Sequence, residues 1–301
     1  MKKSRLGVYC LELEKILSAF GLDGATAKSF VNAEDGEAYS VWKVTSPEKT
    51  YVLKQAKEYE KEVYASFLAG ESGFAPRLYG IHEQEGTAWL LMEYAPGEDL
   101  RFCTREKLQK ALDALIAMQE QWWERPGFGT AAFSMEKARP GRIRRGEDLG
   151  DAALQKYYEG YLNRWESLPR TLCHEDLLPF NVLIGEEKAV LIDWELAGMQ
   201  PYLSSFARLI AHGEEDKDAF FHMRQEDRAF AIDYYYDRLV KDKGIPYDTY
   251  RTDLDYFLLY EYCEWIMLGV RYGNTASERY RRYLALAKAH IKHFKEEEIW
   301  K

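Results

Sequence analysis

Apolar residues follow a strand-like pattern in the first third of the chain. Three short stretches rich in aromatic and β-branched residues predict strands, namely Tyr39–Val44, Tyr51–Leu53 and Ala88–Tyr94. The segment Glu58–Ala69 is charged at first and then apolar, which predicts a helix between the second and third strands. Apolar positions at helical spacing predict another helix within residues 1–20. Strands accompanied by a helix indicate a small α+β lobe.

Beyond the Pro96-Gly97 turn the pattern becomes mostly helical. Thr104 is a suitable N-cap for a helix whose apolar face begins at Leu108. The exception is Val182–Ile192, where two short apolar runs flank four polar residues and predict a β-hairpin. Helical periodicity returns in the segments 151–167, 203–212, 226–241, 253–271 and 277–297.

The two patterns predict one α+β fold of two lobes. We expect residues 1–95, with their leading helix, to form a small β-rich lobe, and residues 96–301 to form a larger, mostly helical lobe. No run approaches the roughly 18 uninterrupted apolar residues that a membrane span needs. The basic N-terminus is not followed by an apolar run long enough for a signal peptide. We therefore expect a cytoplasmic location and no membrane segment.

Charge and cysteine content narrow the possible partners. The net charge is −9, which disfavours binding to nucleic acid, because that binding relies on Lys and Arg displacing counterions. An acidic chain suits a neutral or cationic substrate, although a surface charge that maintains solubility is the simpler interpretation. The four cysteines are far apart and have neither metal-ligand nor CxxC spacing, so we expect free thiols in a reducing compartment.

The strongest chemical signal lies in the segment Leu172–Gly198. Phosphoryl transfer needs a carboxylate to orient the attacking hydroxyl and accept its proton, and it needs oxygen ligands for Mg²⁺. Asp176 supplies the carboxylate. Asn181 stands just before the predicted hairpin and Asp193 just after it, so the open ends of the two strands bring both within roughly 5 Å. The alternative interpretation is a capped loop before a structural hairpin, with Asp193 closing a strand.

This segment resembles the catalytic core of the aminoglycoside phosphotransferase and choline kinase superfamily. The matching elements are His174-Glu175-Asp176, then Asn181, then Ile192-Asp193-Trp194. The resemblance implies a two-lobed protein-kinase-like fold that uses ATP and Mg²⁺ to phosphorylate a hydroxyl group of a small molecule. It also implies that Asp176 is the catalytic base, that Asn181 and Asp193 hold the metal, and that the N-terminal lobe binds the nucleotide.

The resemblance extends to the N-terminal lobe. Lys54 in Tyr-Val-Leu-Lys matches the strand lysine that holds the α- and β-phosphates and pairs with a helix glutamate. We predict Glu62 as that partner, with Glu58, one turn earlier, as the alternative. The segment Leu90–Gly97 resembles the hinge between the lobes, which implies that the carbonyl of Glu93 and the amide of Ala95 contact adenine.

Some positions depart from the family pattern. Glu175 replaces a small residue, Ser205 stands where an Asp often braces the catalytic loop, and Asn32–Ser40 carries one glycine where a glycine-rich turn is expected. These departures favour an alternative function, a kinase-like nucleotide-binding or scaffold protein without turnover. A protein kinase is disfavoured because Asp193-Trp194-Glu195 replaces Asp-Phe-Gly.

A substrate site is expected in the helical lobe. Glu261, Glu264 and Trp265 fall within one predicted helix, and a carboxylate beside a Trp can hold an alkylammonium group through charge and cation–π attraction. The alternative is an amphipathic helix that packs Trp265 in the core. The resemblance implies a small hydroxyl compound of the aminoglycoside, choline or sugar type as the acceptor, and these carboxylates favour a cationic one.

Overall fold

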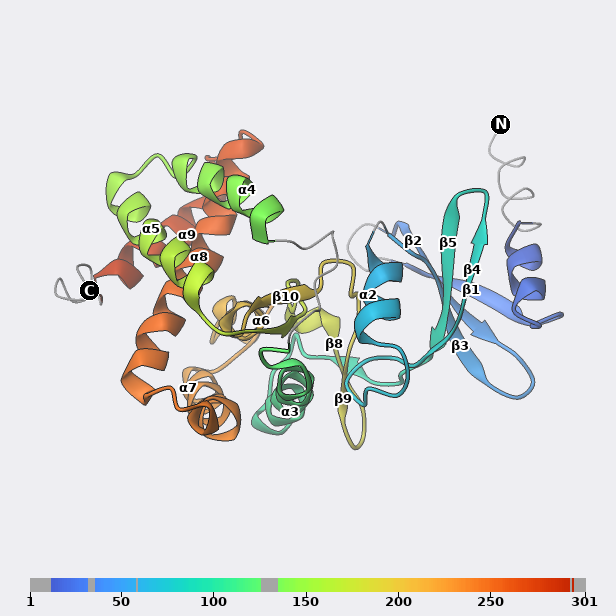
Figure 1. Cartoon of the computed structure of the whole chain (residues 1–301). Coiled ribbons are helices and arrows are strands. Elements are labelled where there is room, and N and C mark those ends of the chain that lie inside the picture. Colours follow the sequence, from blue (N-terminus) through green and yellow to red (C-terminus); the bar gives the residue numbers. More distant parts are fainter. Residues whose placement is uncertain (1–11, 32–35, 58, 126–134, 293, 295–301) are drawn as a thin grey trace.

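A computed structural model describes residues 12–31, 36–57, 59–125, 135–292 and 294. The predicted two-lobed α+β fold is confirmed: a sheet of five antiparallel strands forms the smaller lobe, and helices dominate the larger one (Figure 1). The strand order in the sheet is β1-β2-β3-β5-β4. The strands are β1 (Thr26–Val31), β2 (Ala38–Thr45), β3 (Thr50–Gln55), β4 (Leu78–Gln84) and β5 (Thr87–Glu93).

The two faces of the sheet are covered by different helices, since successive residues of a strand point to opposite sides. Trp89 and Leu91 of β5 pack with Ile16 of the helix over residues 12–19. Their neighbours Leu90 and Met92 join the main core together with helix α2 (Glu60–Phe67). Helix α2 therefore lies between the sheet and the larger lobe (Figure 1).

The larger lobe contains the predicted helices and the predicted hairpin. Thr104 caps the first helix, since its Oγ1 accepts a hydrogen bond from the Lys107 amide. The hairpin pairs Val182 with Leu191, as its sequence predicted.

The helices are α3 (Arg105–Trp122), α4 (Met135–Glu147), α5 (Ala152–Ser167), α6 (Leu203–Ala211), α7 (Gln225–Tyr235), α8 (Tyr247–Arg271) and α9 (Glu278–Ile291), with the shorter η2 (Pro179–Asn181), η3 (Tyr236–Val240) and η4 (Lys241–Lys243). Short strands β6 (Glu98–Asp99), β8 (Val182–Ile184) and β9 (Ala189–Leu191) form one sheet, and β7 (Arg170–Cys173) pairs with β10 (Gly198–Pro201).

The sequence did not predict β1, β4 and α4, nor the short strands β6, β7 and β10. Strand β1 is mostly exposed at the sheet edge, and β4 has a bulge at Leu78/Gly80 that breaks its alternation. Helix α4 is polar and contains Pro140. Among the described residues, no helix is both long and apolar enough to cross a membrane.

The chain passes from the five-stranded sheet to the larger lobe between Glu93 and Glu98. Gly97 in this connection has a φ of +154°. A Cβ at this position would lie 2.4 Å from the carbonyl oxygen of Ile184, whose strand β8 pairs with β6. The close approach of the connection to the hairpin therefore requires glycine.

Replacing Gly97 with Ala should destabilise the protein by about 2–4 kcal/mol, because the added Cβ overlaps backbone atoms that cannot rotate away. The measurement is urea denaturation followed by tryptophan fluorescence. Gly70 provides a matched control: its φ of +108° is similarly strained, but no atom lies within 4 Å of a Cβ built there. Gly70→Ala should cost only about 1–2 kcal/mol, and equal losses for the two variants would contradict the steric explanation.

Candidate active site

The Lys54 side chain joins the two lobes. Its Nζ lies 2.7 Å from Oε1 of Glu60 on α2 and 2.6 Å from Oδ1 of Asp193, which follows β9. The lysine side chain is only 9% exposed. Burial alone would lower the pKa of Lys54, but the two carboxylates outweigh burial and raise it. The predicted strand lysine is therefore a buried, charged group that contacts both lobes.

The helix partner of Lys54 is Glu60, so the prediction of Glu62 was wrong. Glu60 continues the buried stripe of α2 through Val63, Tyr64 and Phe67, which is the face that a helix turns toward the sheet. Glu62 lies two residues farther on, which places it on the exposed face. Glu58, the alternative partner, lies outside the described residues.

The hairpin brings the predicted metal ligands together, as its geometry suggested. The carbonyl of Asn181 accepts a hydrogen bond from the amide of Ile192, so Asn181 stands beside the residue that precedes Asp193. Nδ2 of Asn181 donates to the carbonyl oxygen of Asp176 at 2.8 Å and lies 3.3 Å from its Oδ2. Asp176 and Asn181 are therefore in direct contact, and the hairpin places Asp193 next to them.

The side-chain oxygens at this position suit Mg²⁺. Asn181 uses its Nδ2 to hold Asp176, which leaves its Oδ1 as a possible ligand. Asp193 uses Oδ1 to bind Lys54, which leaves Oδ2 as a metal ligand. Burial of the carboxylate would raise the pKa of Asp193, but the Lys54 ammonium group outweighs burial and lowers it. The described chain contains no cluster of three His, Cys, Asp or Glu residues able to hold a metal. Two oxygen ligands, with the rest supplied by water and phosphate, are typical of magnesium sites in nucleotide enzymes.

His174 and Ser205 support the loop that carries Asp176. The backbone amide of His174 donates to Oγ of Ser205 at 2.7 Å, so the serine braces the loop. The His174 ring packs against Trp194, and its Nε2 lies 2.8 Å from the carbonyl oxygen of Ile192. Burial lowers the pKa of His174, so the neutral ring carries its proton on Nε2 and donates it to that carbonyl.

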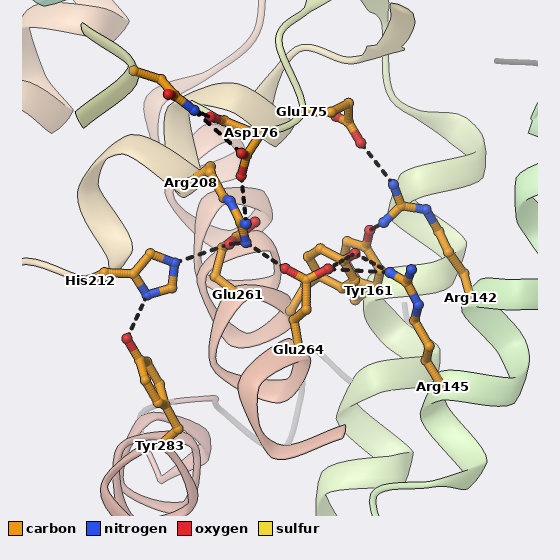
Figure 2. A network of polar contacts seen from close by, with 12 residues as sticks. Arg142, Arg145, Tyr161, Glu175, Asp176, Arg208, His212, Glu261, Glu264 and Tyr283 are labelled. Atoms are coloured by element: carbon orange, nitrogen blue, oxygen red, sulfur yellow. Dashed lines mark hydrogen bonds and ion pairs between the residues drawn. The ribbon is translucent and has the colours of Figure 1, made fainter. Parts of the chain in front are cut away.

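Arg208 of α6 is the residue at this site that the sequence did not mark. Its Nη2 donates to Oδ1 of Asp176 at 2.8 Å, and its Nη1 contacts Glu261 at 2.9 Å and also Glu264 (Figure 2). The guanidinium group is 13% exposed, and its pairing with three carboxylates outweighs burial and raises its pKa. His212, on the other side of Glu261, lies 3.2 Å from Oε2 of that residue.

A cavity of about 380 Å³ lies between α4, α8 and the loop that carries Glu175, the residue that precedes Asp176. Glu261 and Glu264, two of the residues predicted to hold the substrate, line it together with Arg142 and Arg145, and their contact with a substrate stays a prediction. The predicted pairing of Glu261 with Trp265 was wrong, because Glu261 turns toward Arg208. Trp265 does not line the cavity; its ring stacks on that of Tyr283 and lies under the guanidinium of Arg279.

The predicted adenine contacts lie where the lobes meet. Glu93 is the last residue of β5, and Ala95 follows it in the connection to the larger lobe. Their contact with a nucleotide base stays a prediction.

Comparison with known proteins adds an independent observation. Residues 29–239 match the sequence model of the phosphotransferase enzyme family, and no functionally curated protein matches the chain at a significant level. A choline kinase from Cryptosporidium parvum Iowa II has a similar structure, with a TM-score of 0.62 and 13% identity over 92% of this chain and 91% of that one. Choline kinase LicA from Streptococcus pneumoniae gives a TM-score of 0.60 and 16% identity over 94% of this chain and 99% of that one. A thermostable mutant of aminoglycoside phosphotransferase APH(4)-Ia, in complex with ADP and hygromycin B, gives a TM-score of 0.60 and 16% identity over 93% of this chain and 97% of that one. At these identities the likeness confirms the kinase-like fold.

Replacing Arg208 with Met should lower the free energy of unfolding by about 3–5 kcal/mol, since it leaves buried carboxylates without their cation. Arg145 offers a comparison on the same network, because its side chain is 44% exposed. Arg145→Met should cost about 1 kcal/mol or less. Both values follow from urea denaturation at neutral pH, and a loss below about 1 kcal/mol for Arg208→Met would show that the network contributes little to stability.

Proposed function

Because this chain belongs to the phosphotransferase enzyme family, we propose that it is an ATP- and Mg²⁺-dependent kinase acting on a hydroxyl group of a small molecule. The family resemblance predicted from the segment His174–Trp194 is confirmed by the match over residues 29–239. One observation carries the proposal: Lys54, Asp176, Asn181 and Asp193 lie together where the two lobes meet, and Glu175, the residue before Asp176, lines a cavity.

The proposed nucleotide site uses residues 1–95 and the start of the larger lobe. Lys54 holds the α- and β-phosphates, and Glu60 keeps its ammonium group in place. The carbonyl of Glu93 and the amide of Ala95 hydrogen-bond adenine, since both stand in the connection between the lobes. Asn181 and Asp193 would hold Mg²⁺, which would supply positive charge to the phosphates when bound.

Asp176 acts on the acceptor in this proposal. Its carboxylate orients the acceptor hydroxyl and takes its proton as the oxygen forms a bond to the γ-phosphorus. The bond between that phosphorus and the β–γ bridging oxygen breaks, and ADP leaves with the electron pair. Arg208 fixes Oδ1 of Asp176 and Asn181 lies against Oδ2, so the carboxylate is held in one orientation before the acceptor binds.

Replacement of Asp176 with Asn should reduce turnover by about 10²–10⁴-fold, because the amide cannot accept the hydroxyl proton. Binding of ATP should change little, since Asp176 contacts neither Lys54 nor Asp193. ADP release with a panel of hydroxylated amines and sugars measures the first effect, and titration with MgATP measures the second. If ATP binding disappeared together with turnover, the role given to Asp176 would be wrong. Binding of MgATP by the unaltered protein without ADP release on any acceptor would instead support the nucleotide-binding scaffold.

A pair of variants tests the ion pair of Lys54. Glu60→Gln should reduce kcat/KM for ATP by at least about tenfold, because the ammonium group loses the partner that holds it toward the phosphates. Glu62→Gln removes a charge from the same helix at an exposed position and should change this constant by less than about twofold. The reverse ranking, with Glu62→Gln the more damaging variant, would favour the partner predicted from the sequence.

A further inference from the structure

Arg208 contacts Asp176 from inside the larger lobe, and its orientation depends on its other contacts. Its Nη2 donates to Oδ1 of Asp176 at 2.8 Å, whereas its Nε is buried and has no partner among the described residues. The remaining nitrogen, Nη1, binds Glu261 and Glu264 of α8 (Figure 2). The groups that hold these two carboxylates therefore determine how the planar guanidinium group faces Asp176.

The two glutamates have different surroundings. Glu264 also accepts a hydrogen bond from Nη1 of Arg145, a side chain that is 44% exposed. Glu261 lies beside His212, whose Nε2 is 3.2 Å from the Oε2 atom that Arg208 also contacts. The side chains of His212 and Glu261 are only 1% and 5% exposed. The contact through Glu261 is therefore the more deeply buried of the two, and it continues to His212.

Both ring nitrogens of His212 have a partner. His212 comes four residues after Arg208, directly beyond the end of α6, and its Nδ1 lies 3.0 Å from the hydroxyl oxygen of Tyr283 on α9 (Figure 2). A carboxylate can only accept hydrogen bonds, so the nitrogen that faces Glu261 carries the ring hydrogen. Burial raises the pKa of Tyr283 to about 12, so its hydroxyl keeps its proton and donates it to Nδ1. The rings of Tyr283 and Trp265 stand edge-on to the imidazole and hold its plane.

We propose that His212 is a positioning residue for Asp176. The proposal rests on the proposed function, in which Asp176 orients the acceptor hydroxyl. Tyr283 orients the His212 ring, whose Nε2–H directs the Glu261 carboxylate. That carboxylate orients the guanidinium of Arg208, which holds Oδ1 of Asp176. Because a small misplacement of a group that aligns reacting atoms lowers turnover, loss of His212 should lower kcat without changing ATP binding.

Two substitutions separate this role from packing. His212→Leu fills a similar volume without a hydrogen-bond donor, and it should lower kcat by at least about fivefold while KM for ATP changes by less than about twofold. His212→Gln can bring an amide N–H to Glu261 and should recover kcat to within about threefold of the unaltered protein. ADP release with the best acceptor of the panel of hydroxylated amines and sugars gives both constants.

His290 provides the matched control. Its Nε2 lies 2.8 Å from the backbone carbonyl oxygen of Asp255, a contact that does not lead to Asp176. His290→Leu should therefore lower kcat by less than about twofold. A kcat unchanged in His212→Leu, or a loss that His212→Gln does not recover, would overturn the proposal and leave the kinase function intact.

A double-mutant cycle tests whether the effect passes through Arg208. Arg208→Lys keeps the charge but has no planar fork to bridge two carboxylates. In the Arg208→Lys protein, His212→Leu should change kcat by less than about twofold further, because the connection is already broken. A second loss as large as that in the unaltered background would show that His212 acts by another route and would contradict the proposal.

Histidine NMR gives a readout that needs no acceptor. In protein labelled with ¹⁵N-histidine, the ring resonances that disappear in His212→Leu belong to His212. At neutral pH they should show hydrogen on Nε2 and none on Nδ1. Asp176→Asn should shift them and leave the ring resonances of His290 unchanged, because only His212 is connected to Asp176.

This readout separates the two proposals. His212 resonances that show hydrogen on Nδ1 alone, or that do not respond to Asp176→Asn, would overturn the positioning role even in an active kinase. If the resonances respond as expected but no compound of the panel releases ADP, the connection from His212 to Asp176 stands and the kinase proposal fails.

Discussion

The placement of the two lobes depends on one buried ammonium group. Lys54 comes from the five-stranded sheet, Glu60 from helix α2 and Asp193 from the loop after β9, and the two carboxylates lie within 2.7 Å of Nζ. An ammonium group removed from water costs several kcal/mol unless carboxylates compensate for it. A movement that separated the lobes would break the ion pair between Lys54 and Asp193 and leave Lys54 paired with Glu60 alone. The contact that places the lobes is thus also the one that shapes the proposed phosphate site.

The segment that contains Asp176 and Asn181 lies between two residues with strained backbone angles. Glu175 and Asp193 both have left-handed backbone angles, with φ of +61° and +67°. Each costs about 1–2 kcal/mol and each is held by a cation from another element, Arg142 for Glu175 and Lys54 for Asp193. The two residues flank the segment that contains Asp176 and Asn181. Ion pairs to distant elements therefore hold both ends of this segment, which fixes its side chains before any ligand binds.

The sequence predicted those parts of the fold in which neighbouring residues determine the structure. The hairpin Val182–Leu191 and the helix capped by Thr104 have local signals, and both are present. Strand β1 is a mostly exposed edge strand, and β4 carries a bulge, so neither has the alternation that identifies a strand. Their structure depends on pairing with β2 and β5, which no short window of sequence reveals.

The residues of the candidate site also differ in whether the neighbouring sequence reveals them. Asp176, Asn181 and Asp193 were predictable because one loop and one hairpin carry all three. Glu60 had a usable signal, because it continues the buried stripe of α2. The family resemblance nevertheless pointed to Glu62. Arg208 had no local sequence signal, because its ion-pair partners lie 32 to 56 positions away along the chain.

Arg208 connects the proposed base with the wall of the acceptor cavity. Its guanidinium donates to Oδ1 of Asp176 while Asn181 lies against Oδ2, so both oxygens of the carboxylate have a neighbour that orients the group. The same guanidinium neutralises Glu261 and Glu264, the carboxylates that would otherwise attract a cationic acceptor. A cation that used these glutamates would compete with Arg208 and would loosen the group that orients the base. The residue that orients the carboxylate of Asp176 therefore also pairs with the carboxylates that line the cavity.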